Sequence, residues 1–491
     1  MFTQRKFVIL SFLVGLIFTL LFFKKDLGIS FFIFSLTFLT FLMYCLKEVE
    51  LLKKNGTWLF AIPILLLSLS YAITSNEILW FFNFLGIVVI SVIMTIVLTT
   101  KQYINWARLK FVTNIIDTIF SPFNYIFKPF KILFENNKFI NRGKYRKIIA
   151  KVLLGLLFSI PFLFVLIALL ASADMIFNQM ISYLPQFLGD WFNGQFFIDT
   201  ILQIIIMMIV GTYTWCYFYN LLKEKKEEKV VNEEDKIVKE EKMRIDQVVT
   251  ITVLAMINIL YIIFCVIQFS YLFGGGTGKL PGDFTYAEYA RKGFFELILV
   301  TIMNIGIILG TIYFTKKDSK ISNNIIKIFL ILISFATFIM LYSSFFRMRL
   351  YEQNYGYTYL RVFVYFFLFI EVIMLCETVW YILKQNFNII KMYFITFIIC
   401  YTILNYINID KMIAKNNIDR YFATGKIDVK YLNTLSFDSI PQMTRLLNAK
   451  DEAITNEVRE HFSNLKNRLN RDRSFVEYNY SIEKAKDIVN R

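Results

Sequence analysis

Long apolar runs with few charged residues recur along most of this 491-residue chain. A run of about 18 or more apolar residues is long enough to cross a bilayer as an α-helix. The sequence therefore predicts an all-α fold, a polytopic transmembrane helix bundle with about eleven spans. The predicted spans are residues 7–23, 27–46, 57–75, 78–100, 148–170, 198–222, 247–272, 291–315, 324–346, 360–383 and 388–408.

The charged residues lie mainly in the loops between these runs, although the chain carries 53 Lys and Arg and a net charge of +16. Most of the basic residues fall in alternate loops. Because loops rich in Lys and Arg stay in the cytoplasm, the N-terminus is predicted inside, and an odd number of spans places the C-terminus outside. Richness in Ile, Phe, Asn and Lys is typical of an AT-rich bacterial genome. The predicted location is the bacterial plasma membrane.

Several function classes are disfavoured by composition. The positive charge does not indicate nucleic-acid binding, because the chain contains no RNA-binding aromatic motif, zinc finger or helix-turn-helix signature. The single histidine, His461, argues against His-based zinc sites and catalytic triads. The cysteines fall in apolar runs without metal-ligand spacing. We predict no catalytic residue, no metal and no cofactor. The cysteines are Cys45, Cys216, Cys265, Cys376 and Cys400.

The spans and loops divide the chain into regions. We expect a four-span N-terminal region, a basic amphipathic segment on the cytoplasmic leaflet, spans five and six with an outer loop, a charged cytoplasmic linker, five further spans with outer polar loops, and an extracytoplasmic helical domain. Apolar residues at helical spacing predict this last domain, and Asp438–Pro441 predicts a helix start capped by Asp or Ser. The regions are 1–100, 101–147, 148–222, 223–246, 247–408 and 409–491.

The outer stretch 347–361 is unusually polar for a segment between two spans. It holds Arg347, Arg349, Arg361, Glu352 and four tyrosines. A guanidinium group suits bidentate contact with a carboxylate or a phosphate. Two interpretations stay open: a structural ion-pair network that ties the outer loops together, and a binding site for an anionic headgroup or phosphate. Arg349 and Glu352 are three residues apart and could pair.

Two other outer loops carry charged candidates. Asp174 follows span 148–170, where it either caps a short helix or pairs with an arginine of another loop. Loop 273–292 is rich in glycine but does not match a phosphate-binding loop, because Phe273 and Leu280 stand where Gly and Ser or Thr are needed. Glu288 and Arg291 can pair on one helix face. The predicted outer cluster is Asp174, Asp283, Glu288, Arg291, Arg347, Arg349, Glu352 and Arg361.

Three glutamates fall inside predicted spans. Glu371 lies near the middle of 360–383, with Glu377 six residues further on, and Glu296 lies about one turn inside 291–315. A charge in the bilayer costs several kcal/mol unless it is paired or protonated. Glu371 is therefore either a proton or cation carrier, or a protonated carboxyl bonded to a neighbouring helix. Its candidate partners are Asn258, Gln268 and Asn304.

A set of motifs resembles a family of bacterial multi-pass inner-membrane proteins known as a domain of unknown function. The resemblance covers about 150–447 and is weaker in the first four spans and the last forty residues. It implies an integral membrane protein and assigns no activity. The motifs are Ala171–Asp174, Gln268–Gly274, Thr285–Phe295, Arg347–Glu352, Gly356–Arg361, Ala414–Tyr421, Asp428–Leu432 and Leu435–Pro441.

Three functions are compatible with these residues. The first is a membrane scaffold or sensor, in contact with the phospholipid bilayer, whose outer cluster binds an anionic lipid headgroup, a cell-wall intermediate or an envelope protein. The second is a proton- or cation-coupled transporter that uses Glu371 and Glu296. The third is an envelope transferase acting on a lipid-linked substrate through Asp174, Asp283 or Glu288. The first is the preferred hypothesis, and the transferase ranks last because no paired acid and base are evident.

Overall fold

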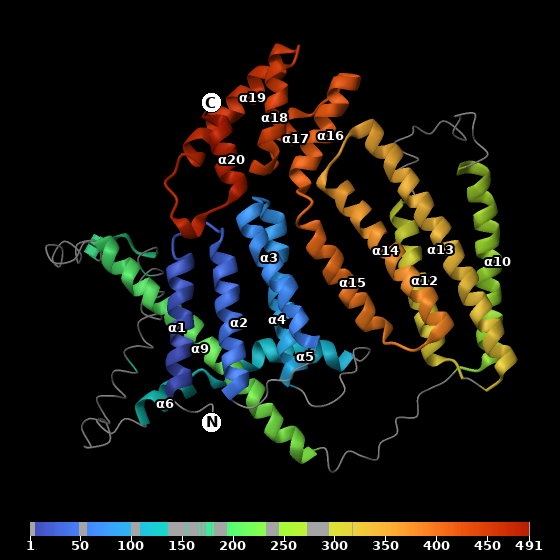
Figure 1. The fold of residues 1–491 in the computed structure, drawn as a ribbon, viewed down its shortest axis with the longest axis horizontal. Coiled ribbons are helices and arrows are strands. Elements are labelled where there is room, and N and C mark those ends of the chain that lie inside the picture. The colour runs from blue at the N-terminus through green and yellow to red at the C-terminus, as the bar shows by residue number, and fades with distance from the viewer. Residues whose placement is uncertain are drawn as a thin grey trace. The chain divides into compact units, whose positions relative to one another are not determined.

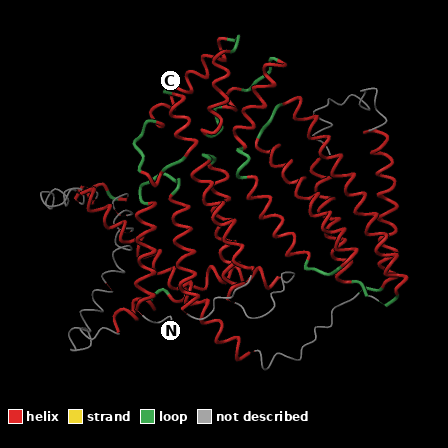
Figure 2. The backbone as a smooth tube through the Cα atoms, in the orientation of Figure 1, coloured by secondary structure: helices red, strands yellow, loops and turns green. Residues whose placement is uncertain are grey.

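The computed structural model is built from helices (Figures 1 and 2). Within the described residues no strand occurs apart from an isolated bridge between Ile245 and Thr315. This confirms the predicted all-α fold. The structure describes residues 5–48, 56–99, 109–135, 155, 166, 170, 173–177, 179–180, 194–231, 245–272, 294–316 and 318–490.

The chain forms two compact units, and each takes a short segment from a distant part of the sequence. The first unit comprises Met1–Ile73, Phe81–Lys236 and Asp472–Asn479. The second unit comprises Thr74–Trp80, Ile237–Arg471 and Tyr480–Arg491. No single cut in the sequence therefore separates one unit from the other.

In the first unit, α1 packs along α9 through a close contact of two glycines. A Cβ atom on Gly15 would lie 2.3 Å from the Met207 carbonyl oxygen, and one on Gly211 would lie 2.6 Å from the Phe12 ring. Small residues at such crossings let membrane helices approach closely. The long helices of this unit are α1 (Arg5–Phe22), α2 (Ser30–Glu48), α3 (Ala61–Ile73, preceded by η1, Gly56–Phe60), α4 (Glu77–Thr99, whose first residues up to Trp80 belong to the second unit) and α9 (Gly194–Val231).

Three short helices of the first unit lie in the segment predicted to be amphipathic. They are α5 (Leu109–Phe120), η2 (Ser121–Tyr125) and α6 (Lys128–Glu135), and α5 runs crosswise to α2 and α3 in Figure 1. Phe120 at the end of α5 and Phe127 between η2 and α6 are exposed. Exposed aromatic residues beside basic ones suit a position at the membrane interface, which stays a prediction.

The second unit contains five long helices that run side by side in Figure 1. Hydrogen bonds between polar side chains join neighbouring helices. Gln268 accepts from Ser343 at 2.8 Å, and Asn304 donates to Thr337 at 2.9 Å. Such bonds hold helices together where burial of apolar surface gives no driving force. The helices are α10 (Gln247–Leu272), α12 (Phe294–Phe314), α13 (Lys320–Tyr355), α14 (Tyr359–Lys384) and α15 (Ile389–Leu404).

The chain after residue 408 forms short polar helices around a small apolar core. Ile413, Met443 and Val458 are fully buried in that core, and Leu79 at the start of α4 packs with them. Its elements are α16 (Ile409–Thr424), α17 (Val429–Leu432), η3 (Phe437–Ser439), α18 (Ile440–Met443), η4 (Thr444–Asn448), α19 (Glu452–Leu469), η5 (Phe475–Glu477) and α20 (Tyr480–Val489).

By length and hydropathy, 9 helices of the described residues could cross a membrane, or up to 10 if α15 and α16 count as one bent span. The protein is therefore a multi-pass membrane protein. Predicted span 148–170 lies almost wholly outside the described residues. Predicted span 324–346 is the middle of the longer α13, so Arg347–Tyr355 is helix, not loop. The helix continues because no glycine or proline interrupts it before Gly356.

Candidate functional site

The turn between α13 and α14 depends on a glycine. Gly356 has φ +78° and ψ −174°, a conformation that is essentially restricted to glycine. Its amide donates to the Glu352 carbonyl at 2.7 Å. This hydrogen bond closes the last turn of α13. A Cβ atom here would lie 2.3 Å from Oδ1 of Asn417. Both the backbone and its neighbour therefore require glycine at this position.

Helix α16 binds this turn through two side chains. Asn417 accepts from the Tyr357 amide at 2.8 Å and donates to the Tyr357 carbonyl at 2.9 Å. Arg420 donates to the carbonyls of Gln353 and Asn354 at 3.2 and 2.5 Å. A guanidinium group satisfies the last carbonyls of α13 and complements the negative end of its dipole. The motif Ala414–Tyr421 thus holds the turn.

Arg361 and Glu352 are both buried at this turn but have different partners. Arg361 donates to the Gly356 carbonyl, and its guanidinium carbon lies 4.4 Å from the centre of the Tyr351 ring. The Glu352 carboxylate accepts hydrogen bonds from Tyr357 and Tyr365. Burial raises the pKa of Tyr357, and the Glu352 charge raises that pKa further. The ion pairs of the described residues do not include Glu352.

The three arginines of the predicted cluster therefore lie in different surroundings. Arg361 is buried, Arg347 is half-buried, and Arg349 is exposed. The pairing of Arg349 with Glu352 that the spacing allows is not formed. Glu352 uses tyrosine hydroxyls instead, because Tyr357 and Tyr365 reach it from the turn and from α14.

The remaining charged residues predicted near the outer face differ in where the structure places them. Asp174 accepts from the amides of Ile176 and Phe177 at 2.7 and 3.0 Å, so it caps a local helical turn, the first of its two predicted roles. Glu296 is exposed in the first turn of α12. Asp283, Glu288 and Arg291 lie outside the described residues.

A buried pair of aspartates in the second unit was not predicted as a site. Asp410 is 1% exposed and Asp438 is 3% exposed, and the hydroxyl of Ser436 lies 2.8 Å from one carboxylate and 2.9 Å from the other. Asp410 also accepts from Asn76 at 2.6 Å and from the Tyr359 hydroxyl.

Asp438 collects further donors from three segments. It accepts from the Ser75 amide at 2.7 Å, from Asn408 at 2.9 Å and from the Ser481 hydroxyl. The network thus fixes the α3–α4 turn, the start of α14, the start of α16, η3 and α20 on one another. The predicted helix start is present, since α18 begins at Ile440, but the predicted cap by Asp438 or Ser439 is wrong because no side chain caps the helix. The Asp438 carboxylate bonds distant segments instead.

Two asparagines of this network also cap helices. Asn76 accepts from the Leu79 amide at 2.8 Å at the start of α4, and Asn408 accepts from the Lys411 amide at 3.1 Å at the start of α16. The opposite end of each amide group donates to an aspartate. One side chain therefore both starts a helix and places it on the carboxylate pair.

The buried position of Asp410 changes its proton affinity. Its pKa is raised from 3.8 to about 6: burial is the largest cause and the charge of Asp438 adds to it, while hydrogen bonds from Ser436 and Asn76 oppose it. A raised pKa means that the folded state binds the proton more tightly than the unfolded state. The contribution of Asp410 to stability is therefore complete below its ordinary pKa and is lost as pH rises through about 6.

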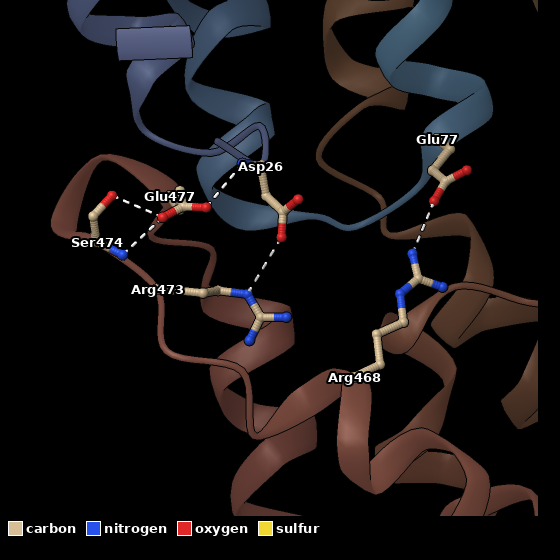
Figure 3. A network of polar contacts seen from close by, with 6 residues as sticks. All are labelled: Asp26, Glu77, Arg468, Arg473, Ser474 and Glu477. Atoms are coloured by element: carbon tan, nitrogen blue, oxygen red, sulfur yellow. Dashed lines mark hydrogen bonds and ion pairs between the residues drawn. The ribbon is translucent and has the colours of Figure 1, made fainter. Parts of the chain in front are cut away.

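In the first unit, segment Asp472–Asn479 binds the α1–α2 turn (Figure 3). Glu477 accepts from the Asp26 amide at 2.9 Å and from the amide and hydroxyl of Ser474 at 2.8 Å, which is a capping box. The Tyr478 carbonyl accepts from the Ile29 amide at 3.1 Å. A Cβ atom on Gly28 would lie 2.6 Å from that carbonyl oxygen, so the two backbones touch.

Figure 3 also shows an ion pair of the second unit at the start of α4. Arg468 of α19 lies 3.4 Å from Glu77, and both side chains are mostly exposed. In the first unit, Arg473 lies 3.8 Å from Asp26. Because the Arg468–Glu77 pair is exposed, it contributes little to stability, so the buried aspartates hold the α3–α4 turn more strongly than this pair does.

Inside the second unit, Glu371 meets a hydroxyl from the neighbouring α12. Both carboxylate oxygens lie 3.1 Å from Oγ1 of Thr301, which also donates to the Ile298 carbonyl at 2.7 Å. A hydroxyl has one proton to donate, so a protonated Glu371 that donates to Thr301 satisfies every group. The predicted partners bond elsewhere: Asn258 to backbone carbonyls, Gln268 to Ser343, and Asn304 to Tyr261 and Thr337.

Comparison with known proteins gives one match. No curated protein and no solved structure matches the chain. A family model described as Domain of unknown function (DUF4153) matches residues 61–446. The match begins in α3, further toward the N-terminus than the motifs of the sequence indicate, and it includes the α13–α14 turn and the aspartate pair. The chain therefore belongs to the family described as Domain of unknown function (DUF4153), as its motifs predict.

Proposed function

We propose that the protein is a membrane scaffold or sensor that binds an anionic phospholipid headgroup at the end of α13. The observation that carries this proposal is the exposed guanidinium group of Arg349 beside a carboxylate that does not pair with it. Glu352 is occupied by Tyr357 and Tyr365. The positive charge at this end of the helix is therefore available to an anion from the membrane.

The length of α13 supports this position. Lys327 and Arg347 bound an apolar stretch of about 19 residues, which as a helix is about 28 Å long and matches the hydrocarbon core of a bilayer, about 30 Å thick. Arg347 and Arg349 would then lie at the depth of the headgroups. Arg361, held by the Gly356 carbonyl and the Tyr351 ring, adds charge from a fixed position.

The proposed setting is a bacterial plasma membrane, with the N-terminus in the cytoplasm and the C-terminus outside. The distribution of Lys and Arg supports this orientation. In addition, residues after 408 contact the α1–α2 turn in the first unit and the α3–α4 and α13–α14 turns in the second. All three turns belong to the set of loops predicted to be outside.

Arg349→Gln is expected to lower retention of phosphatidylglycerol by about ten-fold, which is the loss of about 1.4 kcal/mol from one charge-assisted contact. The measurement is native mass spectrometry of the full chain in detergent, with phosphatidylglycerol and phosphatidylcholine offered separately. Because Arg349 is exposed, the variant should fold as the parent does.

The matched control is Lys415→Gln, which removes an exposed cation from α16 and should leave lipid retention unchanged. Equal retention by the parent and Arg349→Gln would contradict the proposal. Arg361→Gln serves as a comparison. If the Arg361→Gln protein failed to accumulate while Arg349→Gln retained lipid normally, the arginines would stabilise the fold and not bind lipid. If the protein bound a soluble envelope protein or a cell-wall intermediate instead of lipid, the proposed phospholipid ligand would be wrong.

A proton-coupled transporter is the second candidate, favoured by the buried Glu371 with Thr301 as its partner. In proteoliposomes that carry a membrane potential, Glu371→Gln is expected to abolish protein-dependent proton flux, read from an enclosed pH-sensitive dye. Glu460→Gln, at an exposed carboxylate of α19, is the control and should keep the flux. Unaltered flux in Glu371→Gln would remove Glu371 from any such mechanism.

A further inference from the structure

A second carboxyl in α14 is buried with one oxygen unsatisfied. Glu377 is 9% exposed. Its Oε1 accepts a hydrogen bond from the hydroxyl of Thr396 on α15. Its Oε2 is buried and has no hydrogen-bond partner among the described residues. Half of this carboxyl group is therefore held by α15, and the other half faces neither a donor nor a cation of the described chain.

The surroundings of Glu377 contain hydroxyls and a thiol rather than positive charge. The charge of Glu377 acts on Tyr393 and Cys400 of α15, and the Tyr393 hydroxyl bonds Thr378, the next residue of α14. The ion pairs of the described residues do not include Glu377. Lys384 and Lys391, which flank the α14–α15 turn, are exposed. An ionised Glu377 would have no positive charge beside it among the described residues, which is costly in a membrane interior.

Glu377 is also separate from Glu371. Six residues of helix correspond to about 9 Å along the axis and about 240° of rotation, so the two side chains meet different helices. Glu371 contacts Thr301 of α12, and Glu377 contacts Thr396 of α15. Glu377 lies about 10 Å from the end of α14 at Lys384, whereas Glu371 lies about twice as deep from that end. A proton entering from the α14–α15 turn would reach Glu377 first.

We propose that Glu377 is a proton-binding site between α14 and α15, which takes up and releases a proton independently of Glu371. The proton comes from water and adds to Oε2, which turns the carboxylate into a neutral acid. Oε1 continues to accept from Thr396. Deprotonation returns the proton to water and restores the buried charge. The occupant is a proton rather than a divalent metal ion, because no group of three or more His, Cys, Asp or Glu side chains that could hold a metal occurs among the described residues.

The test is labelling of the full chain in detergent with dicyclohexylcarbodiimide, followed by mass spectrometry of the peptides. The reagent reacts with protonated carboxyls in apolar surroundings: the O–H adds across a C=N bond, and the product rearranges to a stable N-acylurea. We expect Glu377 to be labelled at acidic pH and labelling to fall about ten-fold per pH unit above its pKa. Glu371→Gln should leave the label on Glu377 unchanged.

Thr396→Val gives a matched perturbation, because it removes the hydroxyl that stabilises the charged form. Labelling of Glu377 should then persist to higher pH. The control is Thr402→Val, which removes a buried hydroxyl of α15 that, among the described residues, bonds the Ile398 carbonyl of its own helix. Thr402→Val should not move the pH profile of the Glu377 label.

Infrared difference spectra between the parent and Glu377→Gln provide a second measurement that does not depend on access by the reagent. A protonated carboxyl band should be present in the parent at acidic pH and missing from the variant. Absence of that band, or a band and label that do not change with pH, would overturn the proposal. Loss of the label in sodium chloride but not in choline chloride would also overturn it, since a metal cation would then occupy the carboxylate.

Discussion

Replacing Asp438 with alanine is expected to open the C-terminal helices of the second unit at a cost on the order of 3 kcal/mol. The carboxylate accepts hydrogen bonds from Ser75, Asn408, Ser436 and Ser481, and the side chain is 3% exposed. Without it, these buried donors lose their acceptor, and alanine leaves no group that can replace it. Unpaired buried donors cost more than the net worth of the bonds themselves.

Hydrogen–deuterium exchange of the full chain in detergent measures this effect. Amides of α16, α18 and α20 should exchange faster in Asp438→Ala, by a factor of about one hundred for a loss of about 3 kcal/mol. The control is Asp419→Ala, which breaks the exposed pair with Arg445 at 2.7 Å and should cost at most about 1 kcal/mol. Equal protection in the two variants would show that the aspartate network does not hold these helices.

Gly356→Ala is expected to disrupt the α13–α14 turn at a cost of about 3 kcal/mol, because alanine is strained in this conformation and its Cβ would meet Asn417 at 2.3 Å. The two hydrogen bonds between Asn417 and Tyr357 would be lost with the collision. Thermal unfolding of the detergent-solubilised chain and exchange of the Tyr357 amide should both report the change.

Gly425→Ala is the matched control for this variant. Gly425 also has a positive φ, +73°, but a Cβ atom there meets nothing within 4 Å. It should therefore show only the backbone strain of a left-handed alanine, about 1 kcal/mol. Equal destabilisation by the two substitutions would mean that the contact with Asn417 has no energetic role.

Hydropathy predicted the spans well because it is a local property of the chain. Every predicted span in the described residues corresponds to a helix, with ends that differ by a few residues in most cases. The exceptions are α13, which extends to Tyr355, and α9, which extends to Val231. In the sequence, the charges of Arg347 and Arg349 suggest the end of the helix, whereas only the end of the apolar stretch lies there. The helix ends where the backbone leaves the helical conformation, and the residue in the sequence that marks this point is Gly356.

Contacts between segments could not be predicted in the same way. Helices that are apolar on all sides give no sign of which neighbour each face meets, so Asn304 was as reasonable a partner for Glu371 as Thr301. The aspartate network has the same origin. Its members lie up to 406 residues apart, from Ser75 to Ser481, and each has a plausible local role, such as the helix caps formed by Asn76 and Asn408. Only the folded chain shows that their second hydrogen-bonding groups converge.

The exchange of short segments between the two units has a consequence for how this chain can be divided. A cut in the charged stretch 223–246 would separate the first half of the sequence from Asp472–Asn479, which binds the α1–α2 turn, and would separate the second half from Thr74–Trp80, which binds the aspartate pair. Neither fragment would then be a self-sufficient folding unit. Two fragments produced together could still rebuild both sets of contacts, since the missing pieces would be supplied by complementation.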